Sequence, residues 1–194
     1  MEPAGIVAAK ADLRRTLLAA RQARPRADWE RDGQRLAEQA LAALPQAART
    51  VTLYVPVGTE PDTRPLLDAL RARGIRVILP ILLPDNDLDW AIYEGWEALL
   101  PARWGLREPA GRRLGVEAVR EADLVLVPAL AVDRAGHRLG RGGGSYDRVL
   151  ARADRRRAVA VVYDDEVLDE IPSEPHDRRV GAILTPSGLI HCRA

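Results

Sequence analysis

Apolar positions near the start of the chain recur every three to four residues, which is the spacing of one helix face. This pattern predicts two helices, over residues 4–24 and 28–44. Asp28 is a candidate N-cap for the second helix, and Pro45 follows it as a stop signal. We expect both helices to pack on the domain formed by the rest of the chain.

After residue 50 the pattern changes to short runs of β-branched and apolar residues. Two of these runs have the length of strands, Val51–Val57 and Ile75–Leu79. A helix predicted over 62–73 lies between them and ends at Gly74. Such a connection is too long for a hairpin and suits a right-handed parallel crossover. The same reasoning predicts strands at 88–93, 124–127, 158–162 and 182–184, and short helices at 114–121 and 146–153.

The alternation of strands and helices indicates the fold class. Asp123 precedes a continuous apolar run to Val127, which is typical of a strand buried on both faces. We therefore expect an α/β fold in three layers, α/β/α, with a mainly parallel central sheet. Residues 1–194 show no repeat or linker and predict a single domain. Within it, residues 81–115 are rich in Pro, Gly and Trp and resemble an insertion that carries binding loops.

Composition and charge exclude several classes of protein. The 29 basic and 28 acidic residues leave a net charge of +1, and the arginine run at 152–157 lacks interleaved aromatic residues, which argues against a nucleic-acid partner. Cys192 is the only cysteine, so no internal disulfide can form. No apolar run approaches the roughly 20 residues that span a bilayer, and the N-terminus lacks a signal-peptide pattern. We expect a cytoplasmic protein with no membrane partner.

One lysine stands out against this background. Lys10 is the only lysine, and every other cation is an arginine. A bias toward arginine explains the trend, and the survival of one lysine by chance is a fair alternative. A lysine nevertheless supplies a compact point charge on a flexible stem, which arginine does not. We therefore treat Lys10 as a candidate functional residue on a solvent-facing helix surface.

The sequence from Arg138 to Asp147 holds four glycines within five residues. Glycines let backbone amides approach phosphate oxygens and permit positive φ, and the helix that follows offers its N-terminal amides to the same anion. Arg138 and Arg141 can add charge-assisted hydrogen bonds, and Asp147 can hold a magnesium ion against the phosphates. The turn therefore predicts a nucleotide-phosphate site for ATP.

Two better-known phosphate motifs do not fit this turn. The dinucleotide fingerprint requires a glycine at position 145, which is Ser145. The P-loop requires Gly-Lys-Ser/Thr, whereas the only lysine follows Ala9. The remaining alternative is a glycine-rich connector that only needs tight turns.

Six motifs, in order along nearly the whole chain, resemble the 5-formyltetrahydrofolate cyclo-ligase family, also called methenyltetrahydrofolate synthetase. They are Lys10–Arg14, Tyr54–Thr63, Arg103–Pro109, Leu126–Asp133, Arg138–Arg148 and Ile171–Asp177. The resemblance implies an ATP- and Mg²⁺-dependent closure of 5-formyltetrahydrofolate, with or without a polyglutamate tail, to 5,10-methenyltetrahydrofolate. We expect a monomer. The alternative is a non-catalytic relative that binds folate or nucleotide.

The resemblance also implies roles for individual residues. The ATP-binding positions are Lys10, Arg14, Arg138, Gly140, Arg141, Gly142, Gly143, Gly144, Ser145 and Tyr146. The substrate-binding positions are Val55, Glu60, Arg141, Gly142, Gly143, Gly144 and Ser145, and the metal ligands are Asp147 and Asp177. Lys10 and Arg141 are the expected catalytic residues. Lys10 and Arg14 are four residues apart, which places both cations on one helix face.

Two positions depart from the family's pattern. Ser145 stands where the family usually has a tyrosine, and Glu166 where it usually has a glutamine. A carboxylate at position 166 would repel phosphates unless it faces magnesium or solvent. Trp104 is a candidate for stacking on a ring of the folate, or it packs on its own domain.

Overall fold

The computed structural model describes residues 3–174 and 177–193, so Pro175 and His176 of the last motif lie outside the described residues. Its main sheet has the strand order β12 (Gly188–His191), β11 (Ala182–Thr185), β9 (Ala158–Val161), β6 (Leu124–Pro128), β1 (Thr50–Thr52), β2 (Arg76–Leu82) and β3 (Leu88–Ile92). The inner strands pair in parallel, and only the edge strands β12 and β3 pair antiparallel. The mainly parallel sheet is therefore confirmed.

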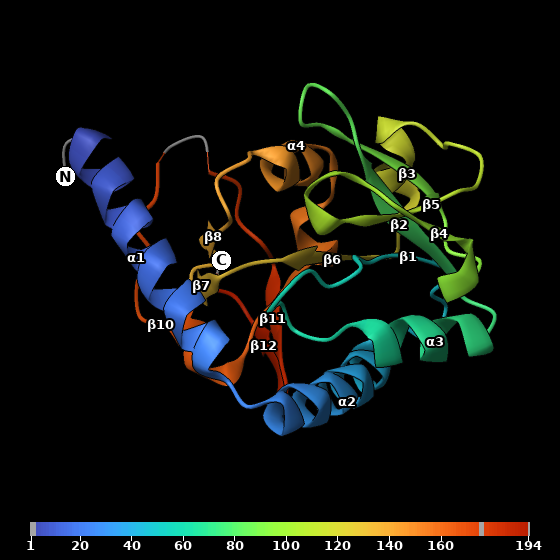
Figure 1. The fold of residues 1–194 in the computed structure, drawn as a ribbon, viewed down its shortest axis with the longest axis horizontal. Helices are drawn as coiled ribbons and strands as arrows, with labels where there is room; N and C mark the ends of the chain where they lie inside the picture. Colours follow the sequence, from blue (N-terminus) through green and yellow to red (C-terminus); the bar gives the residue numbers. More distant parts are fainter. Residues whose placement is uncertain (1–2, 175–176, 194) are drawn as a thin grey trace.

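Helices cover both faces of this sheet (Figure 1). The helices are α2 (Arg26–Ala43) and α3 (Arg64–Ala72) on one face, and α4 (Ser145–Arg152) with the 3-10 helix η3 (Val116–Glu121) on the other. In β6, Leu126 belongs to the same hydrophobic cluster as Leu36 of α2. Val125 and Val127 belong to a second cluster, which contains Val149 of α4. The strand is thus buried from both sides, and the α/β/α layering is confirmed. Among the described residues, no helix combines the length and apolarity needed to cross a bilayer.

Some predicted boundaries were wrong. Asp28 is not the N-cap of α2, because the helix already begins at Arg26 after an extended Pro25, and the Asp28 carboxylate instead accepts a hydrogen bond from Arg31. The strand predicted over 51–57 ends at Thr52. The chain therefore leaves the sheet early, and the residues that follow lie beyond the carboxyl end of β1. The predicted insertion supplies β3 and a hairpin of β4 (Leu99–Pro101) and β5 (Arg107–Pro109).

A small second sheet was not predicted. It consists of β10 (Val167–Leu168), β7 (Ala131–Asp133) and β8 (Arg138–Leu139). The first helix, α1 (Pro3–Ala23), lies beside this sheet and outside the three layers, at the left of Figure 1. Leu17 of α1 packs there with Leu130, Leu139 and Ile171.

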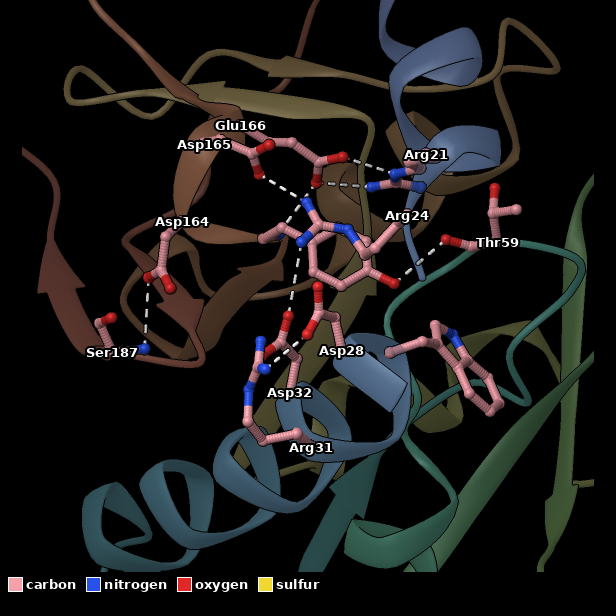
Figure 2. A network of polar contacts seen from close by, with 12 residues as sticks. Arg21, Arg24, Asp28, Arg31, Asp32, Thr59, Asp164, Asp165, Glu166 and Ser187 are labelled. Carbon is pink, nitrogen blue, oxygen red and sulfur yellow. Dashed lines mark hydrogen bonds and ion pairs between the residues drawn. The ribbon is translucent and has the colours of Figure 1, made fainter. Parts of the chain in front are cut away.

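A buried ion pair fixes the C-terminal end of α1 to the rest of the molecule (Figure 2). Arg21 donates from Nε and Nη2 to the two carboxylate oxygens of Glu166, at 2.6 and 2.8 Å, and Nη2 also donates to the carbonyl of Ala129 at 2.6 Å. Both side chains are almost fully buried. The next turn of the chain adds Arg24, whose guanidinium lies 3.8 Å from the ring centroid of Tyr163. Glu166 is therefore neutralised by Arg21 and does not face solvent.

We predict that Glu166→Ala lowers the free energy of unfolding by about 3–5 kcal/mol, because it leaves the buried Arg21 cation without its counter-charge. Urea denaturation measures the change. The matched control is Glu30→Ala, which removes an exposed ion pair to Arg26 and should cost no more than about 1 kcal/mol. Equal small losses in both variants would contradict the structural role given to Glu166.

Candidate active site

A cavity of about 460 Å³ opens at the carboxyl ends of β1 and β6. These neighbouring strands form a switch point, because β1 connects through α3 to β2 on one side while β6 lies on its other side. Ligands of open α/β sheets bind at such points. Tyr54 and Val55 follow β1, Pro128 and Ala129 lie at the end of β6, and all four line the cavity. Its volume suits a small-molecule ligand.

The cavity collects every site residue that the sequence predicted. Its lining includes Lys10, Arg14, Val55, Glu60, Arg138, Gly140, Arg141, Gly142, Gly143, Gly144, Ser145, Tyr146, Asp147 and Asp177. These residues come from α1, the segment after β1, the glycine turn with the start of α4, and the segment near residue 177. Side chains separated by more than 160 positions in the sequence therefore face one space.

The glycine turn joins β8 to α4. Gly142 has φ 101° and Gly144 has φ 72°, in the region that side chains with a Cβ rarely adopt. Gly144 is the N-cap of α4, so the turn delivers the unpaired N-terminal amides of that helix to the cavity side. Arg14 donates from Nε to the carbonyl of Gly140 at 2.9 Å, which holds α1 against the turn.

The sequence predicted Lys10 on a solvent-facing helix surface, and this prediction was wrong. The residue is 7% exposed, and its Nζ donates to Glu174 Oε2 at 2.8 Å and to Asp177 Oδ2 at 2.6 Å. The cause is tertiary contact, because Glu174 and Asp177 lie 164 and 167 positions away in the sequence and both contact this side chain. Burial by itself lowers the pKa of Lys10, but the hydrogen bonds from Asp177 and Glu174 outweigh it and leave the pKa above its ordinary value. The ammonium group therefore stays charged.

The arginines of the turn are also paired with carboxylates. Arg138 is buried and donates from Nη2 to Asp147 Oδ1 at 3.0 Å. Arg141 Nε lies 3.1 Å from Glu60 Oε1, which links the turn to the segment after β1. Burial raises the pKa of Glu60, while the nearby Arg141 charge and the Val57 amide oppose that rise.

The predicted metal ligands fit a hard cation. Asp147 and Asp177 both line the cavity and offer carboxylate oxygens. Mg²⁺ commonly uses one or two protein carboxylates together with substrate phosphates and water. Across the described part of the chain, no three His, Cys, Asp or Glu side chains gather into a self-sufficient metal site. The donor set therefore suits an ion that arrives with a phosphate ligand.

Trp104 lines the cavity but is 83% exposed, so it does not pack on its own domain. It has φ 62°, which is uncommon for a residue with a large side chain. The ring is thus left available at the cavity. Ser145 is half-buried in the first turn of α4 and also lines the cavity.

Sequence reasoning missed several polar lining residues. Arg21, Tyr54, Glu108 and Glu174 belong to the cavity but had no assigned role. Tyr54, Glu108 and Glu174 lie inside the six motifs, but the resemblance gave them no role. Arg21 follows Arg14 by seven residues, or about two helical turns, so extending the cationic face of α1 would have found it.

Comparisons with known proteins identify the family of this chain. The profile of the 5-formyltetrahydrofolate cyclo-ligase family matches residues 6–186. A 5-formyltetrahydrofolate cyclo-ligase from Mycolicibacterium smegmatis is 46% identical over 191 residues, covering 95% of this chain and 97% of that protein. The Escherichia coli K12 protein of the same name is 33% identical over 144 residues, covering 72% and 79%.

A solved structure shares the fold as well. The 5,10-methenyltetrahydrofolate synthetase of Aquifex aeolicus superposes with a TM-score of 0.77 at 27% identity, covering 95% of this chain and 93% of that one. The family profile, the curated relatives and the fold thus confirm the family resemblance that the six motifs carry. The chain belongs to the 5-formyltetrahydrofolate cyclo-ligase family of enzymes.

Proposed function

We propose that this protein closes 5-formyltetrahydrofolate to 5,10-methenyltetrahydrofolate while ATP is converted to ADP and phosphate. One observation carries the proposal: residues from separate motifs of the family converge on one cavity at the switch point of the sheet. The Mycolicibacterium smegmatis relative, at 46% identity, bears the name of this activity.

The chemistry explains why the cavity needs charge and positioning and no nucleophilic side chain. A formamide carbon is a poor electrophile, and its oxygen is a poor leaving group. Transfer of the γ-phosphoryl group of ATP to the formyl oxygen creates a good leaving group. N10 of the same substrate then attacks the formyl carbon and loses its proton, and the carbon–oxygen bond breaks as phosphate departs with that oxygen. Because N10 is tethered to the substrate, closure of the ring benefits from proximity.

The residues of the cavity match these demands. The glycine turn and the start of α4 offer backbone amides to the phosphates, and Lys10, Arg14 and Arg141 supply positive charge. Asp147 and Asp177 would hold Mg²⁺, which neutralises phosphate charge when bound. Glu60 and Val55 contact the folate in this proposal.

A cyclisation assay tests the proposal directly. Purified protein, 5-formyltetrahydrofolate, ATP and magnesium should give the rising absorbance of methenyltetrahydrofolate, and omission of ATP should abolish the rise. No rise at high protein concentration, with tight folate or ATP binding retained, would instead identify a non-catalytic binding relative.

We predict that Lys10→Ala raises the KM for ATP by about 10- to 150-fold, which corresponds to the loss of a hydrogen bond to a charged group. Steady-state kinetics at saturating folate measure it. The control is Arg15→Ala on the same helix, where the exposed side chain is paired with Asp12, and it should leave the KM unchanged. An unchanged KM for ATP in Lys10→Ala would show that the lysine is incidental.

For Asp147→Asn we expect loss of most magnesium-dependent turnover, because the amide keeps the size of the side chain but removes its charge. A magnesium titration of the rate measures the effect. Asp12→Asn changes an exposed carboxylate of α1 and serves as the control. Wild-type magnesium dependence in Asp147→Asn would remove this residue from the metal site.

A further inference from the structure

One end of the cavity holds Arg21 and Tyr54, two polar side chains to which the proposed function gives no role. Arg21 lies eleven residues beyond Lys10 on α1, about 16 Å along the helix axis. It lines the cavity together with Tyr54, which follows β1, and Glu60. This end is therefore remote from the Lys10–Asp177 pair, where the phosphates and the metal are expected.

Arg21 reaches this end of the cavity with one terminal nitrogen unpaired. Its Nε and Nη2 are bonded to Glu166 and to the carbonyl of Ala129. The remaining Nη1 is buried and makes no hydrogen bond with any residue that the structure describes. Figure 2 shows this nitrogen on the side of the guanidinium away from Glu166. The residue is 2% exposed, so water does not readily satisfy the group.

Tyr54 supplies a second polar atom of the same kind. Its side chain lines the cavity and is 3% exposed, and its hydroxyl makes no hydrogen bond with any described residue. Burial and the neighbouring Glu60 charge raise the pKa of Tyr54 well above its ordinary value, so the hydroxyl stays protonated and can donate. Buried polar groups without partners are rare and costly, and two of them at one end of a cavity indicate a ligand that pairs with them.

The charges around these donors restrict the ligand. The Arg21 cation is already balanced by Glu166, and the Glu60 carboxylate lies close enough to influence the pKa of Tyr54. Glu60 is in turn paired with Arg141, so a phosphate or a carboxylate would find no cation here that lacks a carboxylate partner among the described residues. A neutral cyclic amide fits better, because its carbonyl oxygen accepts from Arg21 and Tyr54 while its N–H groups can donate to Glu60.

We propose that Arg21 Nη1 and the Tyr54 hydroxyl both donate to the ring carbonyl of the folate's pterin and so determine specificity for the folate. This inference rests on the proposed function, which supplies the substrate. Glu166 acts as the positioning residue, because its two oxygens fix the plane of the Arg21 guanidinium and leave Nη1 for the ligand.

Tyr54→Phe tests the proposal, because it removes only the hydroxyl. We expect the KM and the Kd for 5-formyltetrahydrofolate to rise about three- to tenfold, with the KM for ATP unchanged. The melting temperature should stay the same or rise, since the hydroxyl has no partner in the free protein. The control is Tyr93→Phe, whose hydroxyl bonds to Asp68 and does not line the cavity, and folate affinity should not change.

Glu166→Gln tests the positioning role, because the amide keeps one acceptor for Arg21 but cannot accept from both nitrogens. The KM for folate should rise while the KM for ATP stays constant, which a general loss of stability would not produce. Wild-type folate affinity in Tyr54→Phe, or an equal rise in both KM values, overturns the proposal. Calorimetric binding of 5-formyltetrahydrofolate without ATP reports on this subsite even if the wild-type protein fails to catalyse cyclisation.

Discussion

The ion pair between Arg21 and Glu166 is the constraint on which the cavity depends. Helix α1 stands outside the three layers and has only a small apolar contact with the second sheet. Desolvating two charges is costly, and this pair offsets that cost with bidentate geometry and a third bond to the Ala129 carbonyl. Because a helix is rigid along its axis, fixing Arg21 also fixes where Lys10 and Arg14 meet the glycine turn.

Charge compensation is the second organising feature of the cavity. Lys10 pairs with Asp177, Arg138 with Asp147, and Arg141 with Glu60. Under the proposed function, ATP and magnesium would exchange these partners, the phosphates taking cations and the metal taking carboxylates. Each of these three cations then has a counter-charge in the free protein, and the cations are held near the places where phosphates would need them.

The sequence predicted features that depend on neighbouring residues, and it missed those that depend on residues far apart in the chain. The β6 run and the glycine turn are read from neighbouring residues, and both were located correctly. The burial of Lys10 depends on partners 164 and 167 positions away, and no local pattern encodes that contact. The second sheet escaped prediction because its strands are two or three residues long, too short for periodicity. Family motifs identified the lining of the cavity, but they gave no partners for it.

The two departures from the family's pattern differ physically. The family usually has a glutamine at position 166, with one side-chain acceptor oxygen, whereas Glu166 has two. Arg21 donates to both oxygens, from Nε and Nη2. A glutamine would place an N–H group against one of these donors, so the carboxylate holds the guanidinium more firmly. Ser145 has no comparable compensation, because its short side chain leaves this position of the cavity lining without an aromatic ring. The exposed ring of Trp104 lines the same cavity, and it is an aromatic surface still available to a folate ring.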